Sequence, residues 1–165
     1  MSLDTTVSGA SATSYVTLDE VRANLYGPAL QAWDSLSTKD EQEAVVRAVM
    51  DEIECQFYNG ARFSSTQALR FPFAEHYETQ NNVKTPYIHP RVKKACFCQI
   101  EDRLLNGRMN DAFSYRDRGI TSLSLPGSVR STFSNKNVTT RSLLCTKARS
   151  ILAPFFVIGS IAVRR

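Results

Sequence analysis

The sequence has no hydrophobic run long enough to cross a membrane. Its longest apolar stretch, residues 155–163, is interrupted by Gly159 and Ser160 and is much shorter than the roughly 20 residues that a membrane helix needs. Met1 is followed by Ser, Asp, Thr and Gly, and a secretory signal would place a basic stretch and an apolar core there. We therefore expect a protein made in the cytoplasm, without a membrane partner.

The residues that carry most enzyme chemistry are also scarce. There are two histidines, His76 and His89, and neither lies in a zinc-protease or nucleophile-elbow pattern. The glycines are scattered singly and form no phosphate-binding loop. Asp51, Glu52 and Glu54 could bind magnesium, but on a helix they point in different directions, which favours a solvated acidic face. We expect no enzymatic activity and no cofactor.

The four cysteines, Cys55, Cys96, Cys98 and Cys145, do not have the spacing of a disulfide framework or of a structural zinc site. Cys96 and Cys98 lie two residues apart on a predicted helix, about 200° around its axis. With His89 they suggest two alternatives, a zinc site or a thiol nucleophile with its base. Free cysteine is among the most buried residue types, so we expect buried, reduced thiols and no metal.

Charge is distributed unevenly along the 165 residues. Residues 1–54 hold ten acidic residues against three basic ones, a net charge of −7, so the remainder of this +4 chain carries +11. This asymmetry indicates two faces with different neighbours, either a nucleic acid on the basic side or copies of the chain packed acid to base. The alternative is that the two halves neutralise each other within the fold.

Hydrophobic periodicity predicts a mainly α fold, a small bundle of about four helices in one domain. A capping box at Thr17 and Glu20 opens the first helix, and Ser37 or Thr38 caps the second. The face predicted to line the core of this second helix consists of Ala44, Val45, Ala48, Val49, Ile53 and Phe57. The four predicted helices span residues 17–25, 38–58, 90–105 and 140–153.

The remaining segments predict one hairpin and several extended regions. Residues 119–134 alternate on either side of Pro126-Gly127, which predicts a projecting β-hairpin. Residues 61–89 lack a sustained period and predict a long connection without an element of its own. Residues 1–13 are polar and small, and we expect a flexible arm. The domain then spans residues 14–153, followed by a tail over 154–165.

The tail is aromatic and β-branched, and it carries no charge before Arg164. If exposed on its own it would be prone to aggregate by strand addition. Two interpretations remain open. The tail completes the core of its own domain, or it docks on another chain by strand addition or groove insertion.

The basic C-terminal part makes nucleic acid a candidate partner. Residues 106–165 hold ten basic residues against Asp111 and Asp117, with aromatic residues between them. This composition is typical of surfaces that follow phosphates and stack bases. Equally, these residues could form a solvated face or meet acidic helices of a neighbouring copy. The residues considered for a DNA path are Arg116, Arg118, Arg130 and Lys136, with Arg141 nearby.

The order of several motifs resembles the head-to-tail connector proteins of tailed bacteriophages. These are also called adaptor or head-completion proteins, and some relatives carry the label DnaT-like single-stranded-DNA-binding protein. The likeness extends over about residues 14–156. Its motifs are Ser14 to Glu20, Ala32 to Ser37, Asn59 to Arg62, Gln67 to Pro72, Ile88 to Pro90, the hairpin from Gly119 to Ser134, and Ala148 to Phe156.

The resemblance implies a structural protein of the virion neck. Connectors of this family form rings, usually of twelve copies, that bind the portal protein, extend the channel for packaged DNA and receive the tail or stopper protein. The tail would then bind the portal through Phe155, Phe156, Val157, Ile158, Ile161, Val163, Arg164 and Arg165. The hairpin would contact subunits or the tail through Ile120, Leu123, Leu125, Val129 and Phe133.

The sequence departs from the family pattern at two positions of the loop motif. Phe71 stands where relatives often have Trp, and Phe73 stands where they often have Arg. These differences affect the contacts of this loop. The alternative function is that of a monomeric single-stranded-DNA-binding accessory protein that uses the same basic and aromatic residues.

Overall fold

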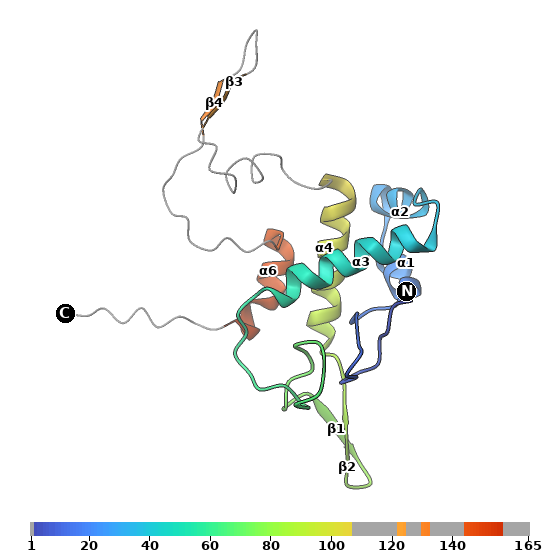
Figure 1. Ribbon diagram of the computed structural model, residues 1–165, viewed down its shortest axis with the longest axis vertical. Coiled ribbons are helices and arrows are strands. Elements are labelled where there is room, and N and C mark those ends of the chain that lie inside the picture. Colours follow the sequence, from blue (N-terminus) through green and yellow to red (C-terminus); the bar gives the residue numbers. More distant parts are fainter. Residues whose placement is uncertain (1, 107–121, 125–129, 133–143, 157–165) are drawn as a thin grey trace, which may run out of the picture.

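The computed structural model of the chain describes residues 2–106, 122–124, 130–132 and 144–156, with the backbone alone at 122–124 and 130–132. The fold is mainly α, as the periodicity predicts (Figure 1). Within the described residues, the elements in chain order are α1 (Leu18–Asn24), α2 (Gly27–Asp34), α3 (Lys39–Glu54), β1 (Tyr77–Gln80), β2 (Val83–Pro86), α4 (Pro90–Asn106), β3 (Ser122–Ser124), β4 (Arg130–Thr132), α6 (Thr146–Leu152) and the 3-10 turn η1 (Ala153–Phe155).

Two helices begin where the sequence predicts. The side chain of Thr17 accepts from the backbone N–H of Glu20, whose carboxylate accepts in return from the N–H of Thr17. Thr38 and Glu41 form the same reciprocal pair at the start of α3. Each capping box satisfies two backbone donors that the first helical turn leaves unpaired.

Helix α2 was not predicted. The sequence predicts no helix between residues 25 and 38, but Gly27-Pro28 opens one over Gly27–Asp34. Gly27 has a φ of +52°, which reverses the chain, and Pro28 occupies the first helical turn, where its missing N–H costs nothing. Helix α2 then packs Trp33, which is 1% exposed, into the core.

The core lies where α3 and α4 cross, with α6 and α2 packed on α4 (Figure 1). On α3 the predicted face is rotated. Val49 and Ile53 are fully buried as expected, but Ala44 is exposed and Phe57, beyond the end of the helix, is 77% exposed. The buried residues of α3 are Glu43, Val46, Val49, Met50 and Ile53. Those of α4 are Val92, Ala95, Cys96, Cys98, Gln99 and Ile100.

A polar network joins three helices inside this core. Glu52 on α3 accepts from the amide of Gln99, at 2.7 Å, and from the guanidinium of Arg103, both on α4. The other atom of the Gln99 amide, Oε1, accepts from the backbone N–H of Cys145 at 2.7 Å, at the start of α6. The pKa of Glu52 is raised by burial, against the opposing effect of these partners.

The cysteines follow the prediction in part. Cys96 and Cys98 are buried, Cys145 is half-buried and Cys55 is exposed. Burial raises the pKa of the Cys96 thiol well above its ordinary value, which disfavours the reactive thiolate. Among the described residues no cluster of three or more His, Cys, Asp or Glu could hold a metal ion.

The region interpreted as a connection without elements, residues 61–89, contains a hairpin. Strands β1 and β2 pair antiparallel, with Gln80 opposite Val83. Asn81 and Asn82 join them with φ values of 50° and 62°, as a two-residue turn with two left-handed positions requires. The strands were missed because their side chains are mostly exposed and polar, so no apolar alternation marks them. In Figure 1 this hairpin projects from the body.

The predicted hairpin between residues 119 and 134 is also present. Ser122 lies opposite Thr132 and Ser124 opposite Arg130 in an antiparallel pair, which confirms its two arms. Residues 119–121, 125–129 and 133–134 of the predicted hairpin lie outside the described part of the chain. The same holds for residues 140–143 of the last predicted helix, which the structure describes from Thr146.

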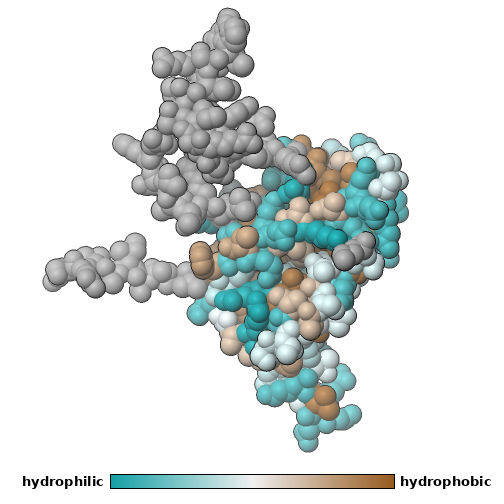
Figure 2. Space-filling view, in the orientation of Figure 1, coloured by the Kyte–Doolittle hydropathy of each residue, from teal (hydrophilic) through white to brown (hydrophobic). Residues whose placement is uncertain are grey.

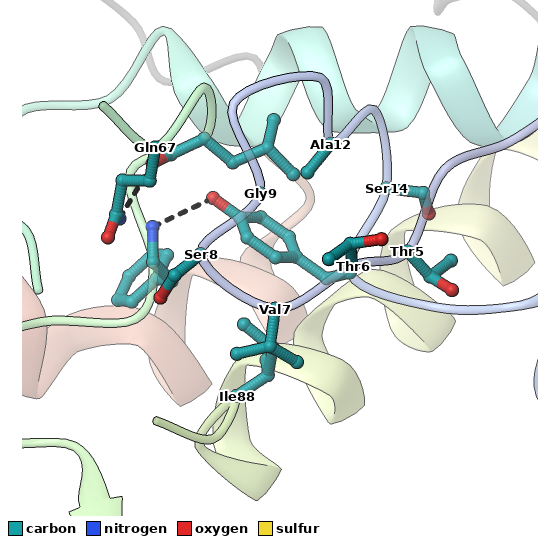
Figure 3. A pocket seen from close by; sticks show the side chains of 12 residues that line it. Thr5, Thr6, Val7, Ser8, Gly9, Ala12, Ser14, Gln67 and Ile88 are labelled. Atoms are coloured by element: carbon teal, nitrogen blue, oxygen red, sulfur yellow. Dashed lines mark hydrogen bonds between the residues drawn. The ribbon is translucent and has the colours of Figure 1, made fainter. Parts of the chain in front are cut away.

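The N-terminal segment expected as an arm lies along the body. The backbone oxygen of Asp4 accepts from Thr13 and Ser14, and its carboxylate accepts from Thr6 and Ser11. Figure 3 shows this coil beside the loop that carries Gln67. A cavity of about 10 Å³ between them has the size of a single water molecule.

The hydroxyl of Tyr15 connects this coil to the core. It donates to the carboxylate of Glu54 at the end of α3 and accepts from the backbone N–H of Phe71 at 3.1 Å. The other oxygen of Glu54 accepts from the N–H of Arg70 at 2.9 Å. Burial raises the pKa of Glu54, and it raises that of Tyr15 well above the ordinary range.

Gln67 fixes the loop that follows. Its Nε2 donates to the carbonyl oxygens of Leu69, Arg70 and Pro72, and its Oε1 accepts from the N–H of Ser64. With an exposure of 2%, this amide replaces the secondary structure that the loop lacks. The loop then presents Phe71 and Phe73, both 1% exposed, to the core.

Polar residues cover most of the face of the body seen in Figure 2, and hydrophobic residues appear there in separate spots. None of the described helices is both long enough and apolar enough to span a bilayer.

Tyr15→Phe is expected to lower the free energy of unfolding by about 1–3 kcal/mol, because it leaves a buried carboxylate oxygen and the N–H of Phe71 without their partner. Tyr26→Phe is the matched control, since Tyr26 is 76% exposed. Urea denaturation of both variants measures the difference. Equal stability of the two variants would show that the Tyr15 hydroxyl contributes nothing.

Gln67→Ala is expected to lower the free energy of unfolding by about 2–3 kcal/mol. The substitution removes the oxygen that accepts from Ser64 and the amide nitrogen that donates to three carbonyl groups. Ser65→Ala, at an exposed position in the same loop, is the control. Thermal unfolding followed by circular dichroism makes the comparison. A loss of less than about 0.5 kcal/mol would contradict the role given to this amide.

Candidate docking site at the C-terminal anchor

Aromatic rings from segments far apart in the sequence meet at the point where the described chain ends. Phe155 and Phe156, which we call the C-terminal anchor, close this group. The aromatic cluster consists of Tyr15, Tyr58, Phe71, Phe73, His76, His89, Phe155 and Phe156. It joins the N-terminal coil, the end of α3, the loop before β1, the start of α4 and the end of α6.

Phe155 lies near the centre of this cluster. Its ring centroid is 5.5 Å from Phe71, 5.7 Å from His76 and 5.3 Å from His89, each in an edge-to-face arrangement. Such pairs contribute about 0.5–1.5 kcal/mol each beyond the burial of their area. The anchor is therefore held by several independent contacts.

The backbone of the anchor is also fixed. The N–H of Asn59 donates to the carbonyl oxygen of Phe155 at 2.8 Å, and Tyr58 and Phe156 form an antiparallel bridge with their rings stacked at 5.5 Å. Pro154 ends α6 because it has no N–H to continue the helix, and Phe156 is extended, with φ −73° and ψ 148°. The body thus sets the position and direction of the chain up to Phe156.

The structure places the predicted tail residues in two groups. Phe155 and Phe156 are half-buried against the body itself, so for them the interpretation as part of the domain's own core applies. The other predicted portal-binding residues lie outside the described part of the chain: Val157, Ile158, Ile161, Val163, Arg164 and Arg165.

Most of the predicted hairpin and DNA-path residues also lie outside the described residues. Leu123 is on β3 opposite Ser131, and Arg130 begins β4, but the structure describes the backbone alone at these positions. The predicted residues outside the described part are Ile120, Leu125, Val129, Phe133, Arg116, Arg118, Lys136 and the nearby Arg141.

Half of the basic side chains on the body are paired with carboxylates. The described side chains comprise twelve basic and fourteen acidic residues, a net charge of −2. Six of the twelve basic residues form ion pairs with carboxylates, among them Arg22 with Asp34 at 2.9 Å and Lys93 with Glu20 at 2.5 Å. Residues 107–143 hold six basic and two acidic residues, a net charge of +4.

Two imidazoles form the polar side of the cluster. The rings of His76 and His89 lie 5.2 Å apart. His76 is 6% exposed, and its Nδ1 is buried without a hydrogen-bond partner. The Nδ1 of His89 accepts from the backbone N–H of Arg91 at 3.1 Å. Burial lowers the pKa of both histidines, with a further lowering of His76 by His89 and of His89 by Arg91.

A shallow groove of about 280 Å³ lies between the N-terminal coil and the segment Pro86 to Ile88. The ion pair of Glu20 and Lys93 lies at its wall. Its volume is just below the range of small-molecule sites. Neither histidine and no cysteine is among the described residues that line it.

Sequence reasoning missed that the aromatic cluster is built largely from the segment interpreted as a connection. The composition of this segment contains a signal of burial, because residues 61–89 hold three Phe and two Tyr. A loop that is fully exposed to solvent would not need these aromatic residues. These are Phe63, Phe71, Phe73, Tyr77 and Tyr87.

Comparison with known proteins gives one match. The model of a family described as "Putative DnaT-like ssDNA binding protein" matches residues 1–165 of the chain. No curated protein and no solved structure matches it.

Phe155→Ala is expected to lower the free energy of unfolding by about 3 kcal/mol, because it removes the ring shared by both histidines, Phe71 and Phe73. Phe57→Ala, at a side chain 77% exposed, is the control and should change stability by less than about 0.5 kcal/mol. Chemical denaturation of the two variants provides the measurement. Equal losses would contradict the central place of Phe155.

Proposed function

This chain belongs to the family of DnaT-like ssDNA-binding proteins, and we propose that it is a head-to-tail adaptor of a tailed bacteriophage. It forms a ring, of twelve copies, beneath the portal protein in the virion neck. The ring extends the channel for packaged DNA and offers a surface to the tail or stopper protein. Residues 157–165 dock on the portal, and the protein is made in the host cytoplasm.

The C-terminal anchor is the observation that carries this proposal. The body fixes the chain up to Phe156 and leaves it in extended conformation. The next seven residues, 157–163, are uncharged and mostly β-branched or apolar. An apolar, β-branched segment that follows a fixed base suits strand addition or insertion into a groove of another protein.

The charges of the body support assembly with other copies. A body of net charge −2 and a segment 107–143 of net charge +4 belong to the same chain. In a head-to-tail arrangement the basic segment of one copy meets the acidic body of the next, and a heterologous contact of this kind closes into a ring.

Two features of the described body support the adaptor role over DNA binding by the body itself. Half of its basic residues are already paired with carboxylates. Its aromatic rings largely face one another in the aromatic cluster, where no base could stack on them. We propose a structural role, without catalysis and without a cofactor.

A second candidate function is single-stranded-DNA binding by a monomer. The family's description favours it, and so does the charge of residues 107–143, which are inserted between α4 and α6. Binding would be non-specific and through phosphates, with Arg116, Arg118, Arg130 and Lys136 as the contacts.

Native mass spectrometry of the protein alone, and after mixing with its candidate portal ring, tests the adaptor role. We expect a defined stoichiometric addition to the portal. A variant that lacks residues 157–165 should lose this addition and keep its helical circular dichroism, because the anchor remains. A chain that stays an 18.5 kDa monomer beside the portal would overturn the proposal.

Filter binding of oligo-dT at several salt concentrations tests the second candidate. If it holds, binding weakens steeply as salt rises, and replacing Arg116, Arg118, Arg130 and Lys136 by Gln abolishes it. Lys147→Gln with Arg149→Gln is the control, since both lie on the exposed side of α6. Tight, length-dependent binding by a monomer would displace the adaptor interpretation.

A further inference from the structure

We propose that His76 and His89 form an acid-sensitive clasp on the C-terminal anchor, and that protonation of this pair releases Phe155 and with it the base of the C-terminal tail. This inference goes beyond the adaptor role and does not depend on which partner the tail binds.

The geometry places both imidazoles against the same ring. Their centroids lie 5.7 Å and 5.3 Å from that of Phe155, each edge to face, and 5.2 Å from each other. No other pair of titratable rings in the described part of the chain contacts the anchor in this way. A charge on either imidazole therefore arises directly beside the residue that holds the tail.

His76 is poorly placed to carry a charge. It is 6% exposed and packs at 5.5 Å on the ring of Phe73, and its Nδ1 has no hydrogen-bond partner. Protonation would give this nitrogen a buried N–H with nothing to accept it. An unsatisfied buried donor costs about as much as a lost hydrogen bond, and a charged one costs more.

His89 is also held in its neutral form, by a hydrogen bond that His76 lacks. Its Nδ1 accepts from the N–H of Arg91, so the neutral ring with its proton on Nε2 is the form that the backbone selects. The residue precedes Pro90 at the start of α4, where the partial positive charge of the helix terminus disfavours a cation. Protonation would break this contact and add a charge beside His76.

The surrounding charges do not compensate for this cost. Arg91 faces His89 and lowers its pKa, and each histidine disfavours a charge on the other. Glu75 acts in the opposite direction on His76, but it is exposed and its effect is the smallest of the three causes. The first turn of α4 contains no acid, and a further ring beside His76, that of Tyr87, lies 6.1 Å away.

The direction of the pH effect follows from these contacts. Both pKa values lie below the ordinary value of 6.5, so the folded anchor binds protons more weakly than the released one. The neutral histidines therefore contribute their full stabilisation of the folded anchor above pH 6.5, and this contribution is lost as the pH falls through the lowered pKa values. Neither histidine lies within a helix, so the helices should keep their structure in the same window.

Amide hydrogen exchange measured by NMR tests the clasp. The N–H of Asn59 donates to the oxygen of Phe155 and reports the anchor, whereas the N–H of Val21, which donates to Thr17 at 3.0 Å in a helix, reports the body. Between pH 7.5 and 5.0 the protection factor of Asn59 should fall about tenfold or more. That of Val21 should change much less.

Titration of the two histidines in the unaltered protein provides the second readout. The chain contains only these two, so their ring signals need no variant for assignment. We expect both to titrate below pH 6.5, with the same midpoint as the loss of Asn59 protection. Titration at the ordinary value of 6.5 with unchanged Asn59 protection would overturn the proposal.

The variant His76→Phe with His89→Phe keeps aromatic rings around Phe155 without a titratable group, and its Asn59 protection should no longer depend on pH. Each single variant should retain part of the dependence. Two results would refute the clasp: a parallel loss of protection at Val21 and Asn59, which means global unfolding, or an unchanged pH dependence in the double variant.

Discussion

The hydroxyl of Tyr15 is the contact on which the rest of this structure depends. It connects the end of α3, through Glu54, to the backbone of the loop at Phe71. Because the carboxylate of Glu54 is also bound by the N–H of Arg70, three segments meet at one buried polar group. A polar group in this position must be satisfied, so the segments are fixed relative to one another more narrowly than apolar packing alone would require.

The position of the loop in turn determines where the chain leaves the body. Once Gln67 has folded the loop around its amide, Phe71 and Phe73 form one wall of the aromatic cluster. Phe155 fills the space beside them, and Asn59 fixes its backbone. The position and direction of the chain at Phe156 are thus a consequence of contacts made about 85 residues earlier in the chain.

The division of charge has a similar structural meaning. Part of the acidic charge of the N-terminal third is paired within the body, because Glu20, Glu43 and Glu52 each contact a basic residue. Asp19, Asp40 and Asp51 are exposed, so the described body keeps a net charge of −2, whereas the segment between α4 and α6 is basic. Body and segment therefore differ in sign, which is the condition for both candidate functions, contact with a neighbouring copy and contact with DNA.

The sequence by itself determined the helices whose ends carry local signals. The capping boxes at Thr17 and Thr38 and the proline at Pro90 act within four residues, and α1, α3 and α4 begin where these signals lie. The mainly α class and the pairing of β3 with β4 follow in the same way from local periodicity and turn residues.

Only the tertiary structure decided the features that depend on distant partners. The rotation of α3 buries Glu43 and exposes Phe57, and no local apolar pattern predicts it. The hairpin of β1 and β2 is polar and has no such pattern either. The aromatic cluster joins residues up to 141 positions apart, from Tyr15 to Phe156, and no local rule relates them. The physical reason is that the burial of a side chain depends on which segments pack against it. Contacts between distant segments exist only in the folded chain, so local sequence patterns do not reveal them.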